Sequence, residues 1–414
     1  MDIWFVLILG AIIGNYLFSV GISLLNLAAL GRTPPPAVSD IYDDEEYQRS
    51  QHYTRQSTIC SIVETTCSVV ILLIFMGVGG FSLLQKLSTS VSDSIYLHAL
   101  LFIGLLLLAS TFISLPFGWF RTFVLETRYG FNRTTVATFI MDKIKAALVV
   151  TIIGVPLLIG VIWLFTSFGG LGWLYCWLAM IGFTVFMQYL VPTVIMPLFN
   201  TFTPLANEEL TQLLQGYACR QNFRIQGIYA MDGSKRSSRL NAFFAGIGHA
   251  KKIVLFDTLL EKLTNQQILA VLAHEMGHYK KHHIWKLGAV AILQSGFMLY
   301  LFSLMVTIPG PFAALGMTPS IAGGMVIFTM LYSPISIVTD LISNALSRRF
   351  EFEADRFSAT TTDDRNALIE GLKILSRENL SNLTPHPAMV YSHYSHPPVD
   401  ARICALNKLS VDGK

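Results

Sequence analysis

The segment Ala146–Phe168 reads AALVVTIIGVPLLIGVIWLFTSF and contains no charged side chain. About 20 mostly apolar residues are enough for an α-helix to cross the hydrocarbon core of a bilayer. Six further runs of this kind occur along the chain: Ile3–Leu25, Thr58–Leu84, Tyr96–Trp119, Leu171–Asn200, Trp285–Ile308 and Ile321–Leu346. The sequence therefore predicts a mainly helical, polytopic membrane protein with seven transmembrane helices.

The composition of the 414 residues agrees with this class. Hydrophobic residues make up 53% of the chain and charged residues 13%, whereas soluble proteins carry about 25% charged residues. These values exclude a disordered or fibrous protein and disfavour a soluble enzyme, whose surface would lack charge. A net charge of only +3 gives no case for a nucleic-acid partner. The five cysteines have no spacing typical of a disulfide framework or a cysteine metal site.

Positive charge indicates the orientation of the chain in the membrane. Of the 29 Lys and Arg residues, 27 fall in the polar segments that follow the first, third, fifth and seventh runs. Lys86 lies in a loop on the opposite side, and Lys286 lies just inside the sixth run. Because Lys and Arg accumulate on the cytoplasmic side, we expect the N-terminus outside and the C-terminus in the cytoplasm.

The polar residues divide the chain into four parts. Residues 1–200 hold transmembrane helices 1–5 with their cytoplasmic loops, and residues 201–284 form a cytoplasmic α+β unit. Residues 285–346 hold helices 6 and 7, and residues 347–414 form a cytoplasmic C-terminal part. Within the α+β unit we expect a helix and three strands, at Asn207–Gly216, Gly227–Met231, Leu240–Ala245 and Lys251–Asp257.

Three ionisable residues, Glu64, His98 and Asp340, fall inside the predicted spans. Such residues are costly in hydrocarbon and face a bundle interior or water. They are either hydrogen-bonded helix–helix contacts or the lining of a hydrated interior.

The most informative motif is His274-Glu275-Met276-Gly277-His278, of the form H-E-x-x-H. On a helix, residues four apart lie on one face, so His274 and His278 can hold one Zn²⁺. Glu275 can then act as general base toward zinc-activated water. Thr264 and Gln267 form a capping box that would begin this helix. The alternative is a helix with two surface histidines and no metal.

A catalytic zinc site needs a third protein ligand, and Glu351 is the candidate. The sixth run leaves the cytoplasm and the seventh returns to it, so Glu351 lies on the same membrane face as the histidines. Asp355, one turn later, can accept the second N–H of a ligand histidine. The alternative is a solvated acidic face paired with neighbouring arginines, an interpretation we prefer for Glu353. We interpret His282 and His283 as membrane-interface residues.

Two further segments fit a protease. His396 and Arg402 can donate hydrogen bonds where negative charge develops on a scissile carbonyl, although a proline-started helix with a surface histidine is the alternative. Residues 239–244 read as an exposed strand to whose edge an extended peptide can add. Asn241 and Ala242 would then contact the substrate. The alternative is a core strand that carries a turn asparagine.

Taken together, these residues resemble the type I CAAX prenyl endopeptidases, a family of integral-membrane zinc metalloproteases. Besides the zinc helix, the resemblance rests on Glu126 with Gly130-Phe131-Asn132, Pro197–Asn200 with Phe202–Leu205, Ser234–Ser238, Asn241–Phe243, Ile253–Leu260, Glu351–Asp355 and His396–Pro398. It extends over nearly the whole chain.

The resemblance implies seven helices around a water-filled intramembrane chamber that is closed by the zinc site on the cytoplasmic side. It implies His274, His278 and Glu351 as ligands of one Zn²⁺, Glu275 as base and Asp355 as partner of a ligand. It implies His396 and Arg402 near the transition state, and Asn241 with Ala242 on the substrate strand. Members remove the last three residues of farnesylated CaaX proteins.

Other functions remain open at this point. A broad-specificity membrane quality-control protease has the same motif, and a transporter or a non-proteolytic scaffold is a further alternative. A bacterial inner membrane is the favoured location, because the outside loops are short and Val411–Lys414 is no endoplasmic-reticulum retrieval signal. The endoplasmic reticulum is the alternative. The expected partners are peptide or protein substrates, prenylated or not, and the lipid bilayer.

Overall fold

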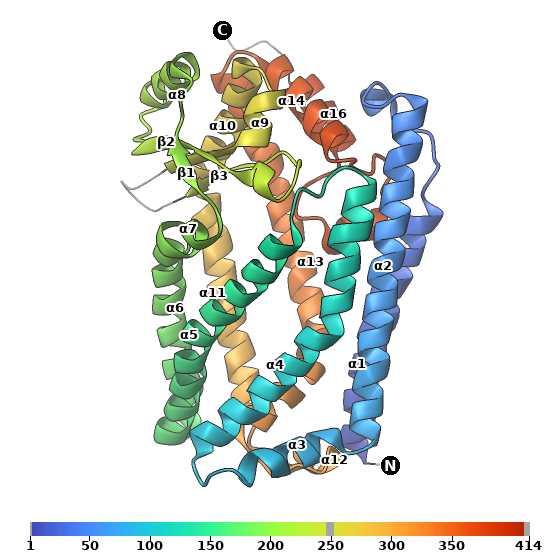
Figure 1. Cartoon of the computed structure of the whole chain (residues 1–414). Coiled ribbons are helices and arrows are strands. Elements are labelled where there is room, and N and C mark those ends of the chain that lie inside the picture. Colours follow the sequence, from blue (N-terminus) through green and yellow to red (C-terminus); the bar gives the residue numbers. More distant parts are fainter. Residues whose placement is uncertain (1, 246–251, 410–414) are drawn as a thin grey trace.

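The computed structural model of the chain describes residues 2–245 and 252–409, and it is a bundle of long helices with a small sheet at one end (Figure 1). Six helical segments are long and apolar enough to cross a membrane. One of them has 64 residues and consists of two successive helices, α5 (Val136–Phe168) and α6 (Gly172–Leu190). Because about 20 residues suffice for one crossing, the segment crosses twice, and seven spanning helices result, as predicted.

The other spanning helices follow the apolar runs closely. They are α1 (Ile3–Ala28), α2 (Asp44–Gly77), α4 (Ile95–Phe120), α11 (His283–Met305) and α13 (Ile321–Thr361). Asp, Ser or Thr side chains cap the N-termini of α1, α2, α4, α5 and α13 by accepting backbone N–H groups. Since α13 continues unbroken past residue 346, the division of the chain into four parts stays a prediction.

Two of the predicted runs are interrupted in the structure. The run Thr58–Leu84 ends at Gly79, whose φ of 70° lies in the left-handed region that glycine adopts without a Cβ penalty. A separate helix, α3 (Gly80–Thr89), follows and closes the end of the bundle together with α12 (Pro309–Ala314) (Figure 1). The run Leu171–Asn200 continues past α6 as a π-helical turn over Val191–Ile195 and the short α7 (Met196–Phe199), each of which carries a proline.

Buried residues of the seven helices gather at the two ends of the bundle. At the end with α3, one hydrophobic core takes residues from all seven helices. In the middle, no described residue is buried from 103 to 120 of α4, from 136 to 161 of α5 or from 177 to 190 of α6. Helices that pack around a dry core bury one continuous stripe. The middle parts of these helices therefore do not pack into one continuous core, which agrees with the predicted chamber.

The ionisable residues within the spans agree with a hydrated interior. Glu64 forms an ion pair of 3.0 Å with Arg121, and both side chains are partly exposed. Asp340 of α13 is exposed, which is costly against lipid but not against water. His98 lies nearer the closed end, where its ring bonds to the carbonyl of Ser92.

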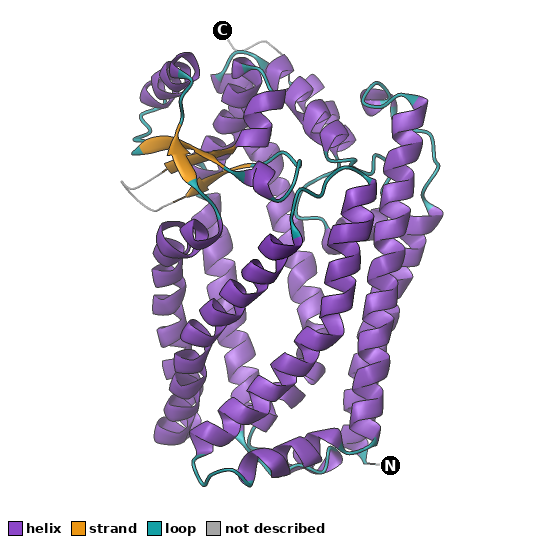
Figure 2. Ribbon diagram, viewed as in Figure 1, coloured by secondary structure: helices purple, strands orange, loops and turns teal. Residues whose placement is uncertain are grey.

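The sheet has four strands in the order β1-β2-β4-β3 (Figure 2). They are β1 (Phe202–Pro204), β2 (Gly227–Met231), β3 (Ala242–Ala245) and β4 (Lys252–Phe256). β2 and β4 are parallel, and β3 pairs antiparallel with β4 at the edge of the sheet. The three predicted strands are present, with Lys251 outside the described residues, whereas β1 was not predicted. The predicted helix is α8 (Glu208–Arg220), capped by Asn207.

The helix α10 (Asn265–Lys280) packs closely on the C-terminal half of α13. A Cβ added at Gly277 would lie 3.0 Å from the Cα of Ala354, so any larger residue would require the two helices to shift by a few tenths of an ångström. One helical turn further along α13, the buried Ser358 hydroxyl donates to the carbonyl of Ala270 at 2.7 Å. This contact fixes the position of the α13 side chains relative to those of α10.

Candidate active site

The helix α10 begins as the sequence predicts. The Thr264 hydroxyl accepts the N–H of Gln267 at 3.3 Å, and the Gln267 side chain accepts the N–H of Thr264 at 2.9 Å. This capping box starts the helix at Asn265, and no break separates that residue from Lys280. His274 and His278 therefore lie one turn apart on the face that meets α13.

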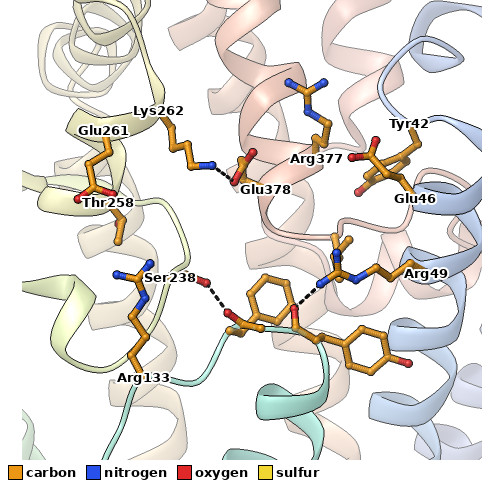
Figure 3. Close-up of a pocket in the computed structure, with 14 residues that line it drawn as sticks. Tyr42, Glu46, Arg49, Arg133, Ser238, Thr258, Glu261, Lys262, Arg377 and Glu378 are labelled. Atoms are coloured by element: carbon orange, nitrogen blue, oxygen red, sulfur yellow. Dashed lines mark hydrogen bonds and ion pairs between the residues drawn. The ribbon is translucent and has the colours of Figure 1, made fainter.

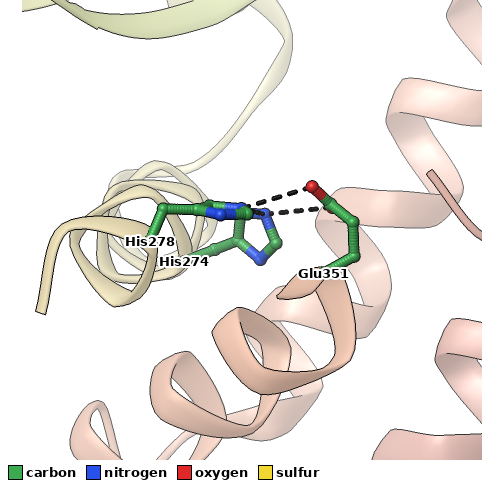
Figure 4. A group of neighbouring side chains, drawn as sticks. All are labelled: His274, His278 and Glu351. Carbon is green, nitrogen blue, oxygen red and sulfur yellow. Dashed lines mark hydrogen bonds and ion pairs between the residues drawn. The ribbon is translucent and has the colours of Figure 1, made fainter. Parts of the chain in front are cut away.

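His274, His278 and Glu351 come together at this contact (Figure 4). The two Nε2 atoms are 3.2 Å apart, and they lie 3.4 and 3.3 Å from the carboxylate oxygens of Glu351. One ligand atom from each residue falls within 4.8 Å of the others. Two imidazoles and one carboxylate are the donor set of a catalytic zinc site with an open position.

The protonation of the site fits a cation. His274 donates from Nδ1 to Asp355 Oδ1 at 2.8 Å, so its Nε2 presents a lone pair to Glu351. Glu351 Oε2 is buried and accepts no hydrogen bond from the described residues. Burial opposes charge on His274, but the neighbouring carboxylates of Asp355 and Glu351 raise its pKa to about 9. The pocket therefore favours positive charge between these three side chains.

Arg402, at the centre of α16 (Val399–Asn407), lies behind the three side chains. It donates to both oxygens of Asp355, at 2.8 and 2.6 Å, and its Nη1 lies 3.6 Å from Glu351 Oε2. Burial opposes its charge, but Asp355, Glu351 and Glu275 hold the pKa of Arg402 above its usual value. Arg402 is thus engaged with Asp355, the partner of a candidate ligand, and its place near the transition state stays a prediction.

His396 and Glu275 occupy the more open part of the site. His396 Nε2 lies 3.3 Å from Glu351 Oε1, yet 63% of the His396 side chain is exposed. Glu275 is half-buried on α10 and makes no hydrogen bond with the described residues. Both side chains are therefore available to a third molecule at the position where the sequence places catalytic groups.

Asn241 and Ala242 stand at the start of the edge strand β3. Asn241 is exposed, its side chain accepts the N–H of Ala242 at 2.9 Å, and its carbonyl accepts the N–H of Phe256 at 3.2 Å. Among the described strands, β3 pairs only with β4, so its other edge is free. The expectation of an edge strand beside the zinc helix agrees with this arrangement.

The segment before β3 is tied to the membrane helices. Ser238 N–H donates to Phe131 O, and Arg133 N–H donates to Arg236 O, both at 3.0 Å. Arg236 also forms a bidentate ion pair with Asp142 of α5, at 2.7 and 2.8 Å. Two motifs of the resemblance, Gly130-Phe131-Asn132 and Ser234–Ser238, therefore meet and hold the segment that leads into β3.

The same junction borders a polar cavity of about 290 Å³ (Figure 3). Lys262 and Glu378 form an ion pair of 3.0 Å across it, and Arg49 donates to Tyr129 O at 2.7 Å. None of the three candidate ligands lines this cavity. It is therefore not part of the His–His–Glu centre.

Sequence reasoning missed the contact of His283 with His278, whereas the pairing of Glu353 with a neighbouring arginine is as predicted. His283 is 1% exposed and its Nδ1 lies 3.2 Å from Nδ1 of His278, so its interpretation as a membrane-interface residue is wrong. Glu353 contacts His283 Nε2 at 3.1 Å as well as Arg349 at 3.3 Å. A third histidine five residues after the motif was the available signal, but that spacing does not share a helix face with His278.

Comparison with known proteins decides the family. Residues 23–201 match the model described as CAAX prenyl protease N-terminal, five membrane helices, and residues 204–410 match the model of peptidase family M48. The chain belongs to peptidase family M48. Membership confirms the predicted metalloendopeptidase and argues against a transporter. A metal centre is part of this assignment, and the enzyme is a multi-pass membrane protein.

Curated relatives of this M48 peptidase match it from end to end. The CAAX prenyl protease 1 homolog of Arabidopsis thaliana is 31% identical over 97% of this chain and 96% of its own length. CAAX prenyl protease 1 of Saccharomyces cerevisiae is 30% identical over 99% of this chain and 97% of its own. The crystal structure of S. mikatae Ste24p superposes with a TM-score of 0.94, at 30% identity, and covers 98% of this chain and all of that one.

Proposed function

We propose that this chain is a zinc endopeptidase of CAAX prenyl protease type, which removes the C-terminal tripeptide of prenylated proteins. The observation that carries the proposal is the Glu351 carboxylate between the two imidazoles. Its buried Oε2 accepts no hydrogen bond from the described residues and lies 3.4 Å from His274 Nε2, and its Oε1 lies 3.3 Å from His278 Nε2. His274, His278 and Glu351 would hold one Zn²⁺. When bound, zinc supplies a Lewis acid that polarises a carbonyl and lowers the pKa of water to about 7.

Glu275 is the proposed general base. Its carboxylate follows the first ligand on α10 and is free of hydrogen bonds with the described residues. It can accept the proton of the attacking water and return it to the leaving amine. The positive charge of the buried Arg402 interacts favourably with this carboxylate.

His396 is the proposed donor to the oxygen on which negative charge develops. Its ring reaches Glu351 from the exposed side of the centre, where a scissile carbonyl has room to approach. A positioned N–H at such a place stabilises the transition state more than the substrate. Arg402 contributes to the reaction indirectly, because its guanidinium binds Asp355 and lies next to Glu351.

The free edge of β3 is the proposed platform for the peptide. Main-chain groups of an extended substrate can pair with an edge strand without regard to sequence. The exposed Asn241 and Ala242 lie where such a peptide would begin to pair. The ties of the preceding segment to α4 and α5 would keep this edge in a fixed position relative to α10.

The chamber is the proposed site for the prenyl chain. No described residue in the middle parts of α4, α5 and α6 is fully buried, and many apolar side chains there are exposed. An isoprenoid chain gains free energy by leaving water for such surfaces, at roughly 25 cal/mol per Å² buried. The relatives named CAAX prenyl proteases support this substrate class. A broad-specificity quality-control protease is the second candidate, since an open chamber also admits unmodified polypeptides.

The proposed topology has the N-terminus outside and the zinc site on the cytoplasmic side. It rests on the distribution of Lys and Arg, and a cytoplasmic site is where prenylated C-termini are exposed. For the location, we retain the bacterial inner membrane with the endoplasmic reticulum as alternative. The named relatives are eukaryotic, which favours the alternative, and Val411–Lys414 lie outside the described residues.

The test compares cleavage of a farnesylated CaaX peptide with that of its unprenylated twin by purified protein in detergent. We expect cleavage of the prenylated peptide, loss of cleavage on zinc chelation, and no cleavage by Glu275→Gln. Equal cleavage of both peptides would favour the quality-control protease. Failure to cut either peptide, by a chain that holds stoichiometric zinc, would remove the CAAX assignment.

A further inference from the structure

His283, the first residue of α11, is buried between the metal centre and the membrane helices. Its Nδ1 lies 3.2 Å from Nδ1 of His278, and its Nε2 lies 3.1 Å from Glu353 Oε2. Its ring stacks on Phe350, with centroids 4.1 Å apart and planes inclined by 4°. Both ring nitrogens and one ring face therefore have a partner, and this degree of constraint is what a buried polar side chain requires.

An unusual backbone turn brings His283 to this place. The helix α10 ends at Lys280, and His282 adopts a φ of 59° in the left-handed region. The His282 N–H donates to Tyr279 O at 3.0 Å and closes the turn. A non-glycine residue in this region costs about 1–2 kcal/mol. The turn reverses the chain so that His283 faces back toward His278, five residues earlier.

If His278 binds metal through Nε2, the protons on His278 and His283 can be placed in only one way that satisfies both contacts and the one to Glu353. His278 then carries its proton on Nδ1 and donates it to His283 Nδ1. His283 in turn carries its proton on Nε2 and donates it to Glu353. Each donor meets one acceptor, and the lone pair of His278 Nε2 is directed at the metal position.

We propose that His283 is a positioning residue that, through Glu353, holds His278 in its metal-binding tautomer and orientation. This inference rests on the proposed zinc site. Asp355 supports His274 by accepting its second N–H directly. In the proposal Glu353 supports His278 in the same way, but through the imidazole of His283. The competing explanation is that His283 serves only to pack against Phe350.

Two substitutions separate these explanations. His283→Phe keeps an aromatic ring for Phe350 but removes both nitrogens. His283→Asn loses the ring but keeps an oxygen acceptor near the position of Nδ1. His282→Asn is the matched control, because His282 is exposed and asparagine tolerates its left-handed backbone.

The measurement is the zinc dissociation constant, obtained by competition with a chromophoric chelator, with the melting temperature recorded alongside. Loss of a residue that orients a ligand weakens metal binding about 10–100-fold, which we expect for His283→Phe. We expect His283→Asn to lose roughly threefold or less because the acceptor remains, and His282→Asn to match wild type.

The opposite order, with tight binding in the phenylalanine variant and weak binding in the asparagine variant, would overturn the proposal in favour of packing. If the phenylalanine variant does not fold, Glu353→Ala decides. It leaves the ring packed, and unchanged zinc affinity in that variant would also overturn the proposal. Wild-type protein that binds zinc but cleaves no peptide refutes the proposed function alone, whereas wild-type protein that retains no zinc refutes both.

Discussion

The two histidine ligands of the candidate centre have unequal surroundings. On the His274 side, Asp355 and Arg402 are 2% and 9% exposed and bind each other through two hydrogen bonds. On the His278 side, Glu353 is 32% exposed and its partner Arg349 is 77% exposed. A buried charge pair cannot lose one member cheaply, whereas water replaces a lost partner at the surface. We call the buried surroundings of His274 the dry side of the centre and the partly exposed surroundings of His278 the wet side. Substitutions should cost more on the dry side.

The largest effect is expected from Asp355→Asn on the dry side. The substitution leaves the Arg402 charge buried without its partner, which costs about 3–5 kcal/mol of folding free energy. Zinc affinity should fall about 10–100-fold, because a neutral amide supports His274 less strongly than the carboxylate does. Thermal unfolding and zinc competition measure both effects. The double variant Asp355→Asn/Arg402→Met is the control, and it should recover much of the lost stability. An unchanged melting temperature in Asp355→Asn alone would contradict the view that the His274 side depends on a buried charge pair.

Gly277→Ala should have the next largest effect, because both sides depend on the contact between α10 and α13. The new methyl group would lie 3.0 Å from Ala354 Cα and 3.1 Å from Phe357 Cβ. Such overpacking costs about 1–3 kcal/mol, and separation of Glu351 from the histidines should lower activity about 100-fold. Gly288→Ala on α11, where nothing lies within 4 Å, should be harmless. If Gly277→Ala and Gly288→Ala had the same stability and activity, the close contact between α10 and α13 would not be needed for the centre.

Glu353→Gln tests the wet side. The neutral amide still accepts a bond from His283, but the carboxylate charge that supports His278 is lost. We expect zinc affinity to fall by about tenfold, the lower end of the range for such partners, and less than in Asp355→Asn. A loss as large as that of Asp355→Asn would show that exposure does not distinguish the two sides.

Arg349→Gln should have the smallest effect. Its ion pair with Glu353 lies at the surface, where such pairs contribute about 0–1 kcal/mol and are screened by salt. Zinc affinity and melting temperature should stay close to those of wild type at physiological ionic strength. A clear loss of zinc would mean that the pair is less hydrated than its exposure indicates.

Much of this architecture could be predicted from the sequence. Composition and run length predict the spans because a bilayer imposes a simple length rule. The motif predicts the two imidazoles because residues four apart share a helix face. Charge asymmetry places Glu351 on the same side of the membrane, although it lies 73 residues after His278. Each of these features is determined by a single rule, namely span length, helix periodicity or charge asymmetry, and can therefore be predicted without knowing how distant segments pack.

The features that were missed depend on several rules acting together. His283 reaches His278 only through the left-handed backbone of His282, which no residue pattern signals. Arg402 was predicted from its charge, but its bonds to Asp355 arise from the packing of α16 against α13. The strand β1 has three residues and is defined by its antiparallel pairing with β2. Pairing and packing between distant segments decide these positions.

The most direct test of the account is the number of zinc ions per chain in purified wild type, Glu275→Gln and Glu351→Gln. The first two should hold one zinc, because Glu275 takes a proton and does not bind the metal. Glu351→Gln should hold almost none after gel filtration, since it loses the only carboxylate ligand. One retained zinc per chain in Glu351→Gln would contradict the proposed His274–His278–Glu351 centre.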